Sequence, residues 1–117
     1  MTESQLFHRV GKRQSESQVE RWLGKRLRDL GCLYCKFVSP GNDGMPDRLI
    51  IMPGGRILFL ELKTTTGRLC ARQRYQIGRL LRWGCTARVA YGRGGAEQFL
   101  DYLLELSCLD GFTEVPK

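Results

Sequence analysis

The chain has 117 residues, a formal net charge of +7 and 42% hydrophobic residues, which fits one ordinary domain with its own core. No run approaches the roughly 18 apolar residues of a membrane span, and the polar start, Met1 to Gln18, lacks the apolar core of a signal peptide. These features argue against a membrane or secreted protein and predict a cytoplasmic location. The excess charge comes mostly from arginine, whose planar guanidinium suits phosphate, so we expect a polyanionic partner.

The cysteines and the histidine offer little chemistry. Five scattered cysteines predict reduced thiols rather than a disulfide framework. Cys32 and Cys35 have the spacing of half a zinc site, but no second pair follows, and strand positions three apart point to opposite faces. His8 is the single histidine and lies in a polar leader, which argues against histidine acid–base catalysis.

The first third of the chain predicts an arm, a helix and a strand. Residues 1–14 lack hydrophobic periodicity and are expected to form a flexible arm. From Ser15 apolar residues recur at spacings of three and four, which predicts a helix that Gly31 ends. Residues 32–38 read as a strand, and residues 39–44 form a loop rich in turn formers.

A hairpin follows. Apolar runs at 49–52 and 57–60 flank a Pro-Gly-Gly break at 53–55, so the segment reads as two antiparallel strands. With a three-residue loop, Met52 pairs with Arg56, and this pairing fixes the register of the whole hairpin.

That register brings charged side chains together. It sets Asp47 opposite Glu61, and directly opposed side chains lie about 4.5–5.5 Å apart at Cβ. Strand alternation puts Lys63 on the same face as Glu61, with Leu62 on the other. Two carboxylates this close are costly unless a cation lies between them, and hard divalent cations bind carboxylate oxygens. The arrangement therefore predicts a Mg²⁺ site, in which Mn²⁺ can substitute.

The remaining sequence predicts a helix, a strand and a helix. The second helix runs over 71–83, with Ile77, Leu80 and Leu81 facing inward. A strand at 86–91 comes next. A glycine-rich loop at 92–95 is then expected before a third helix at 96–106, whose inward residues are Phe99, Leu100, Leu103 and Leu104, with Tyr102 and Leu106 beside them.

The charged pattern of the hairpin resembles that of the PD-(D/E)XK nucleases and, more narrowly, of the VRR-NUC domain. The residues that carry the resemblance are Lys36-Phe37-x-Ser39-Pro40-Gly41, Gly44-x-Pro46-Asp47-Arg48, Phe59-x-Glu61-Leu62-Lys63 and the downstream Gln73. It spans about Ser15 to Tyr91. It implies an α/β fold with a restriction-endonuclease-like αβββαβ core, in which helices flank a central mixed sheet, plus a C-terminal helix. Residues 15–117 would form a single nuclease domain.

The resemblance also implies roles for individual residues. Lys63 and Gln73 would be catalytic alongside Asp47 and Glu61, and the two carboxylates would bind the metal with the Leu62 carbonyl. The family places a further acidic residue on the first helix. Glu16 and Glu20 compete for that role because they lie four apart on one helix face, and we favour Glu20, which lies inside the helix beside the core positions.

The function expected from this resemblance is Mg²⁺-dependent hydrolysis of DNA, most specifically as a Holliday junction resolvase on branched DNA. Phosphate contacts are expected from Lys36, Arg48, Arg68 and Arg72. Two cuts in one junction would require a homodimer, for which the apolar third helix offers a surface. A structure-selective nickase or flap nuclease is the alternative enzyme, and a non-catalytic nucleic-acid-binding module is the alternative of another class. A phage-encoded chain would work in the cytoplasm of a bacterial host.

Overall fold

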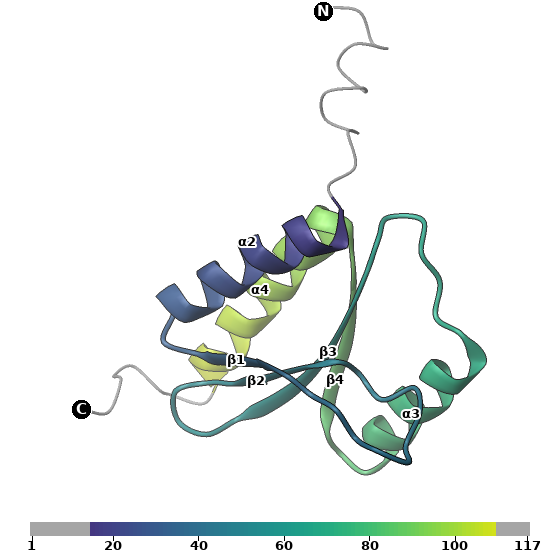
Figure 1. Ribbon diagram of the computed structural model, residues 1–117. Coiled ribbons are helices and arrows are strands. Elements are labelled where there is room, and N and C mark those ends of the chain that lie inside the picture. Colours follow the sequence, from purple (N-terminus) through teal and green to yellow (C-terminus); the bar gives the residue numbers. More distant parts are fainter. Residues whose placement is uncertain (1–14, 110–117) are drawn as a thin grey trace, which may run out of the picture.

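The computed structural model describes residues 15–109, which form a four-stranded sheet with helices on both faces (Figure 1). The elements are α2 (Glu16–Asp29), β1 (Leu33–Lys36), β2 (Arg48–Ile51), β3 (Ile57–Lys63), α3 (Ala71–Arg82), β4 (Thr86–Tyr91) and α4 (Gly92–Leu109). This order confirms the expected core with an added C-terminal helix. The arm expected at 1–14, and residues 110–117 of the expected domain, lie outside the described residues.

The sheet is mixed, with the strand order β1-β2-β3-β4. β2 is antiparallel to both of its neighbours, β1 and β3, whereas β3 and β4 run parallel. The expected hairpin register is confirmed, because Arg48 pairs with Leu60 and the Met52 N–H donates to the Arg56 carbonyl at 2.8 Å. One further step along this ladder sets Asp47 opposite Glu61.

Strand alternation divides the core into two layers. Leu58, Leu60 and Leu62 of β3 are buried on the face that α2 and α4 cover. Phe59 faces the other side, in a smaller cluster with Ile77 and neighbouring residues of α3. In the view of Figure 1, α2 and α4 accordingly lie above the sheet and α3 lies below it at the right. Glu61 and Lys63 share the parity of Phe59, so they face α3.

Local signals at both ends fix α2. The Ser15 side chain accepts a hydrogen bond from the Gln18 N–H, and the Gln18 side chain accepts one from the Ser15 N–H. At the other end, the Gly31 N–H donates to the Arg28 carbonyl and the Cys32 N–H to the Leu27 carbonyl. Gly31 has a φ of +83°, which glycine adopts without steric cost, so the helix stops there as expected.

Three expectations about the later elements are wrong. The loop expected at 92–95 is the first turn of α4, which begins directly at the end of β4, where a Cβ on Gly95 would lie 3.0 Å from the Ala90 backbone. Leu81 is exposed because Gln76, with Ile77 and Leu80, occupies the buried stripe of α3. Leu104 is also exposed.

Among the described residues, no helix is both long and apolar enough to cross a membrane.

Candidate active site

Two carboxylates meet where β2 begins and β3 approaches its end. Asp47 directly precedes β2, held behind the fully buried Pro46, and Glu61 is 6% exposed in β3. The Asp47 Oδ1 atom is buried and has no hydrogen-bond partner among the described residues. A buried acceptor without a partner is costly, so this oxygen is suited to an external donor or a cation.

The pKa of Glu61 reflects both its burial and the nearby charge of Asp47. Burial raises the pKa of the Glu61 carboxyl, and the negative charge of Asp47 raises it further. The positive charge of Lys63 and a main-chain hydrogen bond from Asp47 lower the same pKa, but they do not outweigh the first two effects. A cation bound between the carboxylates would relieve both their repulsion and the cost of burying Glu61.

Lys63 and Gln73 both approach Glu61. The Lys63 Nζ atom lies 3.7 Å from Glu61 Oε2, and the Gln73 Nε2 group donates to the same oxygen at 3.3 Å. The Gln73 Oε1 atom accepts from the Cys70 N–H at 3.0 Å, at the cap of α3. Gln73 thus links the start of α3 to the buried carboxylate, and its catalytic role stays a prediction.

A glutamine and a glycine hold α3 against the loop that leads to Asp47. Gln76 is buried, and its Nε2 group donates to the Asp43 carbonyl at 3.1 Å. Gly44 has a φ of +90°, and a Cβ there would lie 2.5 Å from the Arg72 side chain. Sequence reasoning missed Gln76. The signal available was a polar residue directly before Ile77 on the inward stripe of the helix.

Arg48 connects the first helix to the candidate site. It pairs with Leu60, so its side chain lies on the α2 face of the sheet, where its Nη2 group forms an ion pair with Glu20 Oε2. Its Nη1 group donates to the Asp47 carbonyl at 3.0 Å and lies 3.3 Å from Asp47 Oδ2. Arg48 is thus a buried bridge between carboxylates rather than the accessible cation expected, and its contact with phosphate stays a prediction.

The three expected acidic ligands do not converge. Within residues 15–109, no three acidic, histidine or cysteine side chains group closely enough to hold a metal ion. Glu20 is engaged by Arg48, whereas the charge of the exposed Glu16 makes the smallest of the contributions that raise the pKa of Glu61. The choice between the two helix glutamates therefore stays a prediction.

Even without a helix glutamate, the carboxylates of Asp47 and Glu61 suit a hard divalent cation. They offer carboxylate oxygens at one place, one of these oxygens without a partner. Leu62 packs its side chain into the larger core, so only its main-chain carbonyl could join them.

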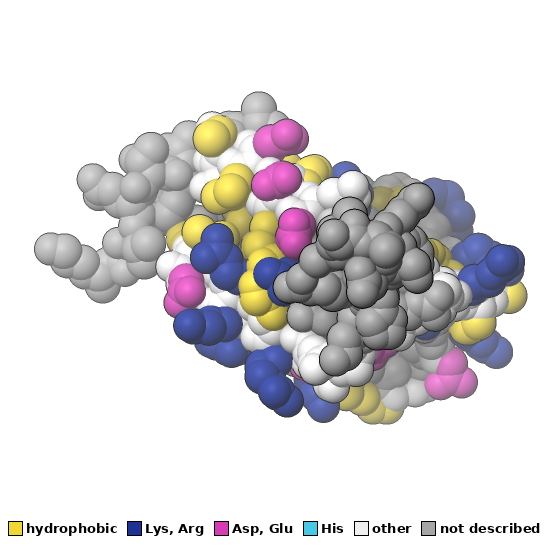
Figure 2. Space-filling model, turned by 90° about the horizontal axis from the view of Figure 1, so that it is seen from above, with side chains coloured by type: hydrophobic (Ala, Val, Ile, Leu, Met, Phe, Trp, Pro, Cys, Tyr) yellow, Lys and Arg dark blue, Asp and Glu magenta, His cyan; other side chains and the backbone are white. Residues whose placement is uncertain are grey.

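Basic side chains surround this end of the sheet. Lys36 is exposed at the end of β1 and pairs with Arg48 across the strands. Arg68 is exposed in the segment between β3 and α3, and Arg72 is exposed in the first turn of α3. Figure 2 shows the molecule from above. Lys and Arg side chains gather along the lower edge of this view and at its right-hand end, which is the side of α3 in Figure 1.

Comparisons with known proteins concern the sequence and the fold. No family model matches the chain. Over 48 residues it is 46% identical to "Putative nuclease p44" of Acyrthosiphon pisum secondary endosymbiont phage 1, an alignment that covers 41% of this chain and 52% of that protein. The chain thus matches about half the length of this curated relative.

Solved structures match over more of the chain. One described as a VRR_NUC domain has a TM-score of 0.69 and 26% identity, covering 74% of this chain and 94% of the other. A second, described as a VRR_NUC domain protein, has a TM-score of 0.60 and 18% identity over 76% and 87% of the two chains, and this likeness concerns the fold.

The mixed sheet, its flanking helices and the carboxylate pair beside a lysine define the class as a nuclease domain of restriction-endonuclease-like fold. Within that class the fold and the motifs of the chain support a VRR-NUC nuclease domain.

Proposed function

We propose that the chain is a divalent-metal-dependent endonuclease that hydrolyses phosphodiesters in branched DNA, as a Holliday junction resolvase does. The observation that carries this proposal is the crowded pair Asp47 and Glu61, with a buried oxygen lacking a partner, directly beside Lys63. A binding module would gain nothing from such a costly arrangement, whereas a hydrolase needs it to hold its metal.

Asp47 and Glu61, with the Leu62 carbonyl, would hold Mg²⁺ or Mn²⁺. A bound ion of this kind supplies water of lowered pKa and neutralises charge on the phosphate. Lys63 stands 3.7 Å from Glu61, where its ammonium stabilises negative charge that develops on the phosphate oxygens. Gln73 fixes the rotamer of Glu61 by donating to it from α3.

The exposed cations would guide the substrate strand. Arg68 and Arg72 come from the segment and helix that follow β3, and Lys36 comes from the end of β1. We expect all three to contact phosphates of the bound strand. Contacts of this kind give affinity without reading bases, so selectivity would come from the shape of the DNA.

A labelled four-way junction, a flap and a linear duplex, each incubated with Mg²⁺ or with EDTA, test the proposal. We expect internal cuts in the junction with Mg²⁺ and none with EDTA. Stronger cutting of the flap would instead favour the flap nuclease or nickase. Binding without cleavage of any substrate would favour a non-catalytic module.

A further inference from the structure

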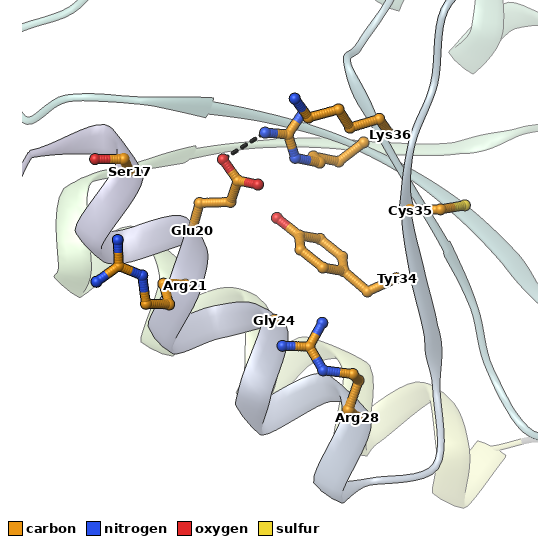
Figure 3. A pocket seen from close by; sticks show the side chains of 9 residues that line it. Ser17, Glu20, Arg21, Gly24, Arg28, Tyr34, Cys35 and Lys36 are labelled. Atoms are coloured by element: carbon orange, nitrogen blue, oxygen red, sulfur yellow. Dashed lines mark ion pairs between the residues drawn. The ribbon is translucent and has the colours of Figure 1, made fainter.

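A cavity of about 400 Å³ opens between α2 and β1, on the α2 side of Arg48. Its walls come from both elements and from the start of β2, and Figure 3 shows their side chains. The lining residues are Ser17, Glu20, Arg21, Gly24, Arg28, Tyr34, Cys35, Lys36 and Arg48. Neither Asp47 nor Glu61 is among them, but Arg48 contacts Asp47, so the cavity adjoins the carboxylate pair without including it.

The charges around the cavity do not balance. Four lining residues are basic and only Glu20 is acidic, and Glu20 is already paired with Arg48. Among residues 15–109, no carboxylate lies within ion-pair distance of Arg21, Arg28 or Lys36. Three cations thus line one hollow without a counter-charge from the described chain, which makes the hollow attractive to an anion.

The cavity wall is also built tightly. The Tyr34 ring packs on Gly24, where a Cβ would lie 3.0 Å from Tyr34 Cδ2 and 3.3 Å from Arg28 Nη1. Gly24 therefore allows the ring and the Arg28 guanidinium to approach the helix backbone together. Figure 3 shows Tyr34 reaching from β1 toward Glu20, with Arg28 beside Gly24.

Tyr34 adds a hydrogen-bond donor. Its hydroxyl is buried close to the Arg48 guanidinium, and its own proton has no acceptor among the described residues. Burial raises the pKa of Tyr34 to about 12, so the hydroxyl is protonated at neutral pH and can donate. Guanidinium groups, an ammonium group and a tyrosine hydroxyl all donate hydrogen bonds that phosphate oxygens can accept.

We propose that this cavity binds a second phosphate group of the DNA, apart from the one that is hydrolysed. The inference rests on the proposed function in taking DNA as the ligand. The phosphate belongs either to an internal position of the strand or to a strand end. Both sources offer the same anionic oxygens to Arg21, Arg28 and Lys36.

Binding of a labelled four-way junction in EDTA tests this without any cleavage. The variant carries Arg21→Gln and Arg28→Gln, and its matched control carries Lys25→Gln and Arg26→Gln, exposed positions of the same helix outside the cavity. We expect the cavity variant to bind about tenfold more weakly, the scale of losing charged hydrogen bonds, and its salt slope to fall by about one phosphate contact. Equal affinities in variant and control, or no binding of DNA by the wild type, would overturn the inference.

Modified DNA separates the two sources. If the phosphate is internal, one neutral methylphosphonate in the strand weakens binding to the wild type but not to the cavity variant. If the phosphate is at a strand end, removal of the 5′-phosphate weakens binding to the wild type but not to the cavity variant. A wild type insensitive to both changes would overturn the inference.

The proposed function can fail separately. Cleavage that does not depend on Asp47, together with a weakened cavity variant, would reject the active-site assignment and keep the phosphate site. Cleavage that depends on Asp47, with the cavity variant binding DNA as tightly as its control, would keep the active-site assignment and reject the phosphate site.

Discussion

At the scale of single residues, Glu61 is held where its charge opposes folding. Because its pKa is raised in the folded chain, the folded state binds the proton more tightly than the unfolded state does. The free energy of unfolding should therefore fall as pH rises from the ordinary glutamate pKa through the raised value. Buried carboxylates that cost stability are typical of sites that bind a cation.

Glu61→Gln should remove this cost. We expect the variant to melt at a higher temperature than the wild type at neutral pH, and to show a flatter dependence of stability on pH across that window. It should also lose cleavage. Thermal melts followed by circular dichroism from mildly acidic to neutral pH measure the effect, and an unchanged pH dependence would show that Glu61 is not the strained group.

The helix glutamates can be distinguished by stability as well as by rate. Glu20→Gln removes the anionic partner of the buried Arg48 and should cost on the order of 1–3 kcal/mol, less than for a fully buried pair because Asp47 remains. Glu16→Gln lies in the exposed first turn and should leave stability unchanged. Denaturant titration of both variants checks this. A metal-dependent rate lost only in Glu16→Gln would make Glu16 the helix ligand.

At the scale of elements, the hairpin shows what a sequence can specify. The apolar runs and the Pro-Gly-Gly break at 53–55 determine the register locally, so the meeting of Asp47 with Glu61 could be predicted. The Arg48–Glu20 pair could not, because it depends on how α2 crosses the sheet. The cavity beside Tyr34 depends on the same crossing and was missed for the same reason.

The approach of α3 to the loop before Asp47 gives an element-scale prediction. Gly44→Ala should destabilise the fold more than Gly41→Ala, although both glycines have positive φ, at +90° and +82°. A Cβ at Gly44 would lie 2.5 Å from Arg72, whereas nothing lies within 4 Å of one at Gly41. Backbone strain alone costs on the order of 1–3 kcal/mol, and the clash adds to it only at Gly44. Equal losses in denaturant titrations would show that the contact with α3 is unimportant.

At the scale of the whole molecule, residues 15–109 of each chain offer one such carboxylate pair, while resolving a junction needs two cuts. A two-fold homodimer would supply them. The stripe of α4 does not by itself call for a partner, because Phe99, Leu100, Leu103 and Leu106 are buried within the chain. We nevertheless expect a dimer when the protein is bound to a junction, measured by light scattering of the complex. A single copy that cuts both strands in concert would contradict this and favour the nickase.

The central claim is that the Asp47–Glu61 pair cleaves DNA with a metal ion. Single-turnover cleavage of a labelled four-way junction in Mg²⁺, by wild type and by Asp47→Asn at concentrations where both are fully bound, tests it most directly. We predict that the wild type cuts the junction and that Asp47→Asn binds it without cutting, because the variant loses a carboxylate ligand at nearly constant volume. Undiminished cleavage by Asp47→Asn would contradict the account.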